Sequence, residues 1–430
     1  MAPRQPRVFS LFWAASSVSD MGSYIRLLAL QVLVVQNLHG NAFDLGMVNA
    51  ARWLPYLLIE LLAGAALDRV DRLRMLVVTD FLLMLLYAAM GLVAYLGHLN
   101  IGWLMGMIFL AGGVTLFHDA ASQSVVRQLV PGSLLLRANA RLEQSGALAQ
   151  TVGPALAGVL TAAIGAPLAV VCDAVGHLFS GALNSLIKGV HAPERTSPAR
   201  VGQDVREGLR WLYGHRFLRV LAWNTNLWFL FHAMVITVLV PFALRQLGFS
   251  ALSLGLVLAA AGLGSLIGTS VSTRAEERWG IGRAIAAARA MYGPSLVLVA
   301  LAPVSDSHGG SAAARVMVAV GQFLYGVAMG IEGPLEMGYR QAITPAHLQG
   351  RTNTTMRATN RTMVVIGAPL GAQSPSLSER VRSYGWPSSA WQWSRPGTSA
   401  RPCTRRSSRP RLPSTPHPRT AARCEGNPHA

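Results

Sequence analysis

Long apolar stretches, each able to cross a lipid bilayer, constrain this chain more than any other feature. A spanning helix needs about 20 residues. Hydropathy predicts such spans at 8–37, 43–67, 75–97, 101–126, 142–165, 167–188, 217–244, 250–272, 284–303 and 313–338. Charged residues make up 13% of the chain, against about 25% in an average soluble protein. We therefore expect an all-α polytopic membrane protein.

The basic residues indicate how the chain lies in the membrane. The net charge is +18, but most Lys and Arg residues fall in every second connection, and only Arg245 and Arg315 fall in the others. Positive charge accumulates on the cytoplasmic side of membrane proteins. We expect a multi-pass protein of a bacterial inner membrane with a cytoplasmic N-terminus, and no nucleic-acid partner.

One cytoplasmic connection is much longer than the rest and divides the chain. Its part VREGLRWLYGHRFLRV alternates apolar and basic residues at helical spacing, which predicts an amphipathic helix on the inner leaflet. The flanking halves repeat, since RQLVPGSLLLRANARL from Arg127 resembles RQAITPAHLQGRTNTTM from Arg340. Parallel repeats of six spans are typical of transporters. We expect an N-terminal bundle at 1–190, a linker at 191–216 and a C-terminal bundle at 217–370.

The turn between the second and third spans carries a family resemblance. GAALDRVDRLR resembles the signature loop of the major facilitator superfamily, with Asp71 in place of its usual second glycine, as in the branch of the enterobactin exporter and macrolide efflux proteins. The resemblance implies two six-helix bundles. It also implies a gating loop that latches the bundles, with Asp68 near the start of the eleventh span. The residues that match the loop are Gly64, Asp68, Arg69, Arg72 and Arg74.

The fifth predicted span contains GALAQTVGPALAG, which resembles the antiporter motif of exporters in the same superfamily. Gly153 and Pro154 predict a bend, and Gly146 and Gly158 predict close packing against a neighbouring helix. The alternative is a generic packing face of small residues.

Ionisable residues inside spans are costly and mark candidate sites. In the first span Asp20 belongs to a polar stripe, and Arg26 lies six residues beyond it, so that the two pair or Arg26 extends to the interface. In the second span Arg52 and Glu60 are eight residues apart on roughly one face. Glu60 is either a proton or cation site or a structural partner for a cation on another helix.

Further candidates occur in later spans. Asp119 is the nearest acidic candidate to the position where drug:proton antiporters usually carry an arginine in span four, which is missing here. His118 and His177 are expected to be satisfied interior side chains rather than metal ligands. The other candidates for a substrate or proton pathway are Asp173, Asn224, Asn226, Glu332 and Glu336. Glu336 has a simpler alternative role, which is a salt bridge at the inner end of its span.

The chain changes character near Gly371. An eleventh span is predicted to start near Met356 and to be interrupted, no twelfth follows, and 371–430 is rich in Arg, Ser and Pro. We expect a disordered tail produced by a frameshift; the alternative is a genuine basic tail.

The sequence predicts a secondary-active exporter of small organic compounds, such as a drug or siderophore, that works by alternating access with proton coupling. Uptake by symport and an inactive truncated product remain alternatives. No ATP-binding loop is present and the sole lysine is Lys188. We expect no cofactor, no metal and no enzymatic activity, a monomer, and the bilayer, a small organic substrate and protons as partners.

Overall fold

The computed structural model describes residues 7–67, 70–187, 201–304 and 311–372, and all regular structure in these ranges is helical. The helices are α1 (Arg7–Val32), η1 (Leu33–Asn37), α2 (Ala42–Leu67), α3 (Arg72–Tyr95), α4 (Ile101–Leu129), η2 (Gly132–Leu134), α5 (Leu135–Ile164), α6 (Ala166–Ser185), α7 (Val201–Gly214), α8 (Arg216–Pro241), η3 (Phe242–Gln246), α9 (Ala251–Trp279), α10 (Ile281–Ala300), α11 (Ala312–Ile343) and α12 (Ala346–Ala372). The prediction of an all-α membrane protein is confirmed.

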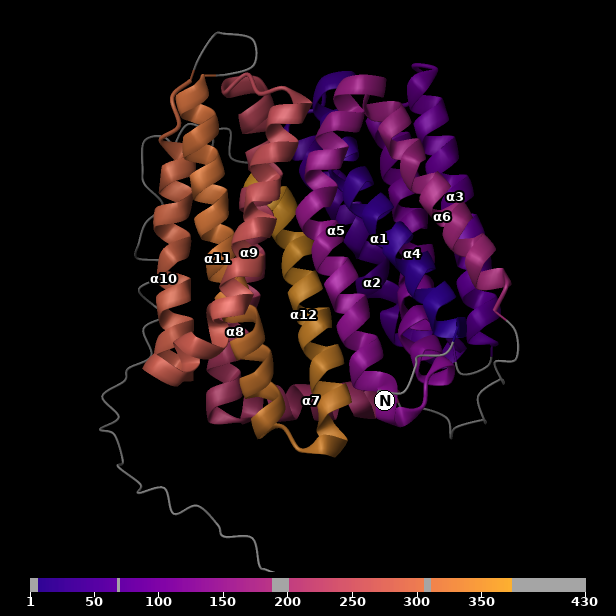
Figure 1. Ribbon diagram of the computed structural model, residues 1–430, viewed down its shortest axis with the longest axis vertical. Helices are drawn as coiled ribbons and strands as arrows, with labels where there is room; N and C mark the ends of the chain where they lie inside the picture. The colour runs from indigo at the N-terminus through magenta and orange to yellow at the C-terminus, as the bar shows by residue number, and fades with distance from the viewer. Residues whose placement is uncertain (1–6, 68–69, 188–200, 305–310, 373–430) are drawn as a thin grey trace, which may run out of the picture. The chain divides into compact units, whose positions relative to one another are not determined.

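The long helices pack as two groups (Figure 1). In the first, α6 packs on α1 and α3, and α4 packs on α2 and α3. In the second, α11 packs on α9 and α10, and α12 packs on α8. Helices α5 and α9 join the groups, as do α2 and α12. The boundaries 1–190, 191–216 and 217–370 remain a prediction.

The helix starts follow from local sequence. Asn100, Ser250 and Ser311 each accept a hydrogen bond from a backbone N–H in the first turn of the next helix. Asp71 does the same for α3, accepting from the backbone nitrogens of Leu73 and Arg74. Aspartate is a favoured N-cap, and glycine offers no side-chain acceptor. Asp71, which stands where the family loop usually has its second glycine, therefore caps the N-terminus of α3.

The predicted spans coincide with helices, and α12 begins before the predicted start of the eleventh span. Eight helices among the described residues are long and apolar enough to cross a membrane, and α2, α10 and α12 are outside that set. Met356, the predicted start of the eleventh span, lies inside α12, which begins earlier at Ala346, directly after Pro345. Its first turns are polar and contact α7, so hydropathy does not reveal them. Apart from the end of α12, the predicted tail 371–430 lies outside the described residues.

The first helix of each half ends in the same irregular way. Both α1 and α8 run into a five-residue π-helix, η1 and η3. The backbone nitrogen of Gly40 bonds to the carbonyl of Val34, and that of Phe249 bonds to the carbonyl of Ala243. The two halves therefore share this π-helical end, although the sequences of η1 and η3 have little in common.

Candidate functional site

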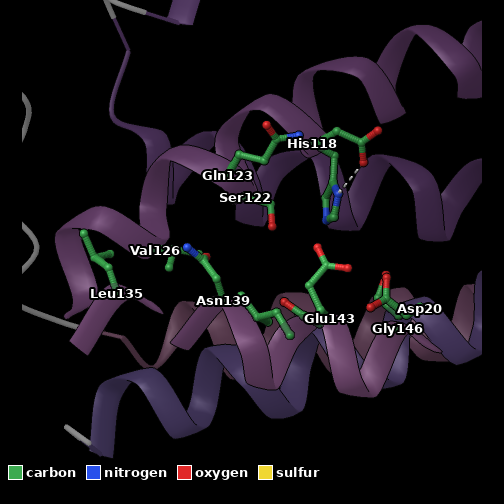
Figure 2. Close-up of a pocket in the computed structure, with 13 residues that line it drawn as sticks. Asp20, His118, Ser122, Gln123, Val126, Leu135, Asn139, Glu143 and Gly146 are labelled. Atoms are coloured by element: carbon green, nitrogen blue, oxygen red, sulfur yellow. Dashed lines mark ion pairs between the residues drawn. The ribbon is translucent and has the colours of Figure 1, made fainter. Parts of the chain in front are cut away.

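A polar cavity of about 900 Å³ lies between α1, α4 and α5. Figure 2 shows His118, Ser122 and Gln123 on one side and Glu143 opposite them, with Asp20 beside Gly146. Gly146 lies beside Asp20, since a methyl group added at Gly146 would lie 3.9 Å from Asp20 Oδ2, an ordinary van der Waals distance. The cavity brings together Asp20, Asp119 and Gly146 from three predicted spans.

Behind one wall of the cavity lies a buried acidic cluster centred on Asp80. Asp80 Oδ1 is 3.1 Å from His118 Nε2 and 3.0 Å from His177 Nδ1. Its other oxygen accepts hydrogen bonds from Ser180 Oγ at 2.9 Å and Asn184 Nδ2 at 3.1 Å. Asp80 is fully buried. The cluster ties α3, α4 and α6 together.

Arg26 does not pair with Asp20. Its guanidinium forms an ion pair with Asp173 on α6 and lies 4.3 Å from the centre of the Tyr87 ring. Both members of the pair are buried. His177, one turn after Asp173, has its Nε2 3.9 Å from Asp173 Oδ1. Asp173 thus links the ion pair to the Asp80 cluster.

Asp119 lies where the two halves meet through α2 and α12. Its Oδ2 accepts a hydrogen bond of 2.9 Å from the Tyr56 hydroxyl. The guanidinium of Arg361 on α12 lies 4.1 Å from the centre of the Tyr56 ring. Arg52 lies over Trp53, at 5.1 Å from the ring centre. Glu60 is in the same helix, but its side chain lies outside the described residues.

The second half has its own buried ion cluster. Arg289 Nε donates to Glu332 Oε1 at 2.6 Å, and its Nη2 donates to Glu336 Oε2 at 3.4 Å. Tyr292 donates to the other oxygen of Glu332 at 2.7 Å. Glu336 also accepts from Thr225 at 2.9 Å. The two carboxylates share the Arg289 cation, as the salt-bridge alternative for Glu336 anticipated.

A smaller cavity of about 200 Å³ lies between the halves. Tyr24, Gln31 and Gln150 line it from α1 and α5. His232 and Gln322 line it from α8 and α11, among mostly apolar side chains. His232 lies between two rings, stacked on Trp228 at 4.5 Å and on Tyr325 at 5.7 Å. This wall is aromatic, flat and weakly polar.

Residues 1–368 match the family described as transmembrane secretion effectors. That match covers most of the chain and decides its family. The chain is a major facilitator superfamily transporter. It is a multi-pass membrane protein of a bacterial transporter family, not an enzyme family.

Curated relatives of the transporter are efflux and siderophore proteins. It is 30% identical over 228 residues to the multidrug efflux pump Tap of Mycolicibacterium fortuitum, covering 51% of this chain and 55% of the relative. It is 26% identical over 152 residues to macrolide efflux protein A of Streptococcus pyogenes, covering 35% and 37%. It is 27% identical over 170 residues to the staphyloferrin A transporter of Staphylococcus aureus, covering 39% and 43%. The chain spans about half the length of the relative Tap, and less of the other two.

Solved structures share the fold. The nucleoside transporter NupG has a TM-score of 0.70 at 10% identity, covering 88% of this chain and 92% of that one. An inward-facing bacterial homologue of the iron transporter ferroportin has a TM-score of 0.66 at 16% identity, covering 87% and 94%. At this identity the likeness concerns the fold alone.

The remaining predicted residues of the transporter lie apart from the cavities just described. Asn226 is buried and donates to the Tyr213 hydroxyl of α7 at 2.7 Å, and Asn224 is half-buried on the same helix. In the gating loop, Asp68 and Arg69 lie outside the described residues, and so does any contact of Asp68 with the eleventh span. Gly64 lies in the last turn of α2, in a segment without described side chains, and Arg72 and Arg74 lie in the first turn of α3.

Asp80, Arg289 and Tyr292 are central to the two buried clusters and were not among the predicted site residues. The sequence holds a signal for the first two, because each is a charged residue inside a predicted span, at 75–97 and 284–303. Tyr292 carries no comparable signal, since tyrosine is common in spans.

The helix-five motif is placed at a contact between the halves. A methyl group at Gly255 would lie 2.3 Å from the carbonyl oxygen of Pro154 and 3.0 Å from the Cα of Gly158. A methyl group at Gly153 would lie 2.5 Å from Cβ of Tyr24. The motif therefore allows α5 to lie against both α1 and α9. The antiporter role implied by the resemblance is a separate, functional prediction.

Proposed function

We propose that this transporter exports small organic compounds, of the drug or siderophore class, by alternating access with proton coupling. The main observation is the 200 Å³ cavity, which is lined by residues of both halves. The family match and the curated relatives that are efflux proteins support the same proposal. Its aromatic wall and glutamine side chains suit an amphipathic organic molecule. Substrate binding there touches both halves at once, as alternating access requires.

The closed side of the transporter supports this mechanism. Arg245 in η3 donates from its Nη2 to the carbonyl oxygens of Val35 at 3.1 Å and Gly40 at 2.7 Å, across the two halves. The glycine contact of α5 and α9 lies at the same end of the bundles. In the proposed orientation, with the N-terminus in the cytoplasm of a bacterial inner membrane, this end faces outward. We infer that these contacts keep the outer side closed.

Proton coupling is assigned to acidic groups at the polar cavity. Asp20 and Asp119 line the 900 Å³ cavity, where water and protons have access. Glu332 and Glu336 are held by Arg289, which favours a structural role for them. We assign Asp20 as the first proton-carrying candidate.

The test uses everted membrane vesicles from bacteria that express the full chain. We expect accumulation of a fluorescent cationic dye or a labelled macrolide when the vesicle interior is acidic, and loss of accumulation with nigericin. Asp20→Asn should reduce proton-driven transport at least tenfold but leave counterflow exchange of substrate intact. Glu277→Gln, at an exposed position in α9, is the matched control.

Two outcomes would contradict the proposal. Accumulation in intact cells instead of everted vesicles would establish uptake by symport. No transport of dyes, macrolides or siderophores in either orientation, by a folded protein, would support an inactive product.

A further inference from the structure

We propose that the Asp80 cluster is a binding site for one divalent transition-metal ion, of the zinc class, with Asp80, His118 and His177 as ligands. The ligand atoms of these three side chains all lie within 4.8 Å of one another. The inference concerns a resident ion in the first half, and it does not depend on the proposed export function.

The ligand set and its spacing suit such an ion. Two imidazole nitrogens and one carboxylate oxygen are the donors that zinc takes in open three-ligand sites. Ligands at about 2.0–2.1 Å from a tetrahedral ion lie about 3.3 Å apart. Asp80 Oδ1 is already 3.1 Å from His118 Nε2 and 3.0 Å from His177 Nδ1. The three ligand atoms lie within 4.8 Å of one another, so the two imidazole nitrogens must come closer together when they share one ion.

The side chains around the ligands are arranged as an outer shell. Histidines that bind a metal usually donate their other ring N–H to a carboxylate or carbonyl oxygen. His118 Nδ1 is 3.9 Å from Asp119 Oδ1, and His177 Nε2 is 3.9 Å from Asp173 Oδ1. Ser180 and Asn184 hold the second oxygen of Asp80, which leaves Oδ1 directed at the two rings. Asp80 is thus oriented by two hydrogen bonds, and each imidazole has a carboxylate oxygen 3.9 Å from its outer nitrogen.

Charge gives an independent argument. Asp80 is 0% exposed, and in the described part of the chain its hydrogen-bond and ion-pair partners are two imidazoles, a hydroxyl and an amide. The nearby Arg26 is engaged with Asp173. A buried carboxylate requires a cation. A divalent ion held by Asp80 and two neutral imidazoles supplies that cation, as one protonated imidazole does without a metal.

The site also has an entrance. His118 lines the 900 Å³ cavity and is 15% exposed (Figure 2). Asp80 and His177 are buried and are not among the residues that line it. We expect an ion to enter past His118. Because the ligands come from α3, α4 and α6, the ion fixes these three helices to one another.

The experiment measures metal on the purified full chain, which carries an affinity tag without histidine. We expect about one zinc per chain after dialysis, and a cobalt-substituted form with ligand-field absorption in the visible. His118→Gln and His177→Gln should each weaken zinc binding at least ~10-fold. His98→Gln, an exposed histidine in the turn before α4, should have no effect.

X-ray absorption of the zinc-loaded wild-type protein gives a test that no variant can confound by misfolding. We expect outer-shell scattering from two imidazole rings. A spectrum without imidazole, zinc absent from the folded wild type, or equal zinc affinity in His98→Gln and both ligand variants would overturn the proposal. In those cases the cluster is a purely hydrogen-bonded one with protonated histidine.

Discussion

At the scale of single residues, Arg289 is the side chain on which the second half most depends. It is buried and contacts both Glu332 and Glu336, which lie one helical turn apart. Removing one partner of a buried ion pair typically costs about 3–5 kcal/mol, because the other charge is left without compensation.

We therefore expect Arg289→Gln to lower the thermal midpoint of the detergent-solubilised protein clearly, as followed by intrinsic tryptophan fluorescence. The double variant Arg289→Gln/Glu332→Gln should regain part of the loss, because one stranded carboxylate is then neutral. Arg283→Gln on the same helix is exposed and should change little. A double variant less stable than the single one would mean that Glu332 stabilises the fold by other contacts.

The buried charges show what sequence could and could not predict at this scale. Asp20 and Asp119 were predicted as separate candidates, and the structure places both on one cavity. Arg26 was expected to pair with Asp20 or to extend to the membrane interface. In the structure it pairs with Asp173, which lies 147 positions away in the sequence. Spacing within one helix predicts which residues share a face, but it carries no information on which helix that face meets.

At the scale of helices, glycines allow α5 and α9, which belong to different halves, to pack with their backbones in close contact. Gly158 and Gly255 lie back to back, and the carbonyl of Pro154 occupies the space next to Gly255. No side chain separates the two backbones.

Gly255→Ala should force these helices apart and impair transport several-fold, with a lower thermal midpoint. Gly293→Ala on α10 is the matched control, because a methyl group there meets nothing within 4 Å. Alanine in place of an unconstrained helical glycine stabilises by about 0.5–1 kcal/mol, so the control should unfold at an equal or higher temperature. Equal behaviour of the two variants would show that the α5–α9 contact is not essential.

The linker helix α7 provides a second test at this scale. Figure 1 shows α7 crosswise to the long helices, and a methyl group at its Gly208 would lie 2.4 Å from Thr355 Oγ1 on α12. Glu207 on α7 also forms an ion pair with Arg351 on α12.

Gly208→Val should release α7 from α12 and increase amide hydrogen exchange in 206–214. The exposed ion pair contributes only about 0–1 kcal/mol, so Glu207→Gln should have a much smaller effect. Exchange that rises equally in both variants would assign the attachment to the ion pair instead of the backbone approach.

Helix periodicity predicted most elements, because apolar stretches and the amphipathic linker both carry strong patterns. Helix α12 is the exception: its first ten residues, 346–355, are mostly polar, and α12 contacts α7. Hydropathy therefore does not reveal where this helix begins. Pro345 marks the true boundary, as its counterpart Pro131 does in the first half, shortly before α5.

At the scale of the whole molecule, Arg245 is a cation that joins the two halves at one end. It is held by two carbonyl oxygens at the end of α1, at 3.1 Å and 2.7 Å. Hydrogen bonds from a charged donor typically contribute about 1.5–3 kcal/mol. This is enough to shift the balance between two states by one to two orders of magnitude.

Arg245→Ala should increase the fraction of molecules that are open at this end. Spin labels at Asn41→Cys and Ser250→Cys, in a chain without its three native cysteines, would report it as a longer component in the distance distribution. Arg315→Ala, exposed at the start of α11, is the control. An unchanged distribution would show that the α5–α9 contact alone keeps this end closed.

The matching π-helical ends also bear on the ancestry of this transporter. An irregular turn that recurs at η1 and η3 is most simply inherited from a single ancestral half, so it is older than the gene duplication that joined the halves. In a dimer of identical halves the two turns would carry the same residues at equivalent positions about a two-fold axis. Arg245 is the fourth residue of its turn, and the fourth residue of the other is Gln36. The cation that joins the two halves at this end therefore comes from one half only, so the contact between the repeated turns is not symmetric.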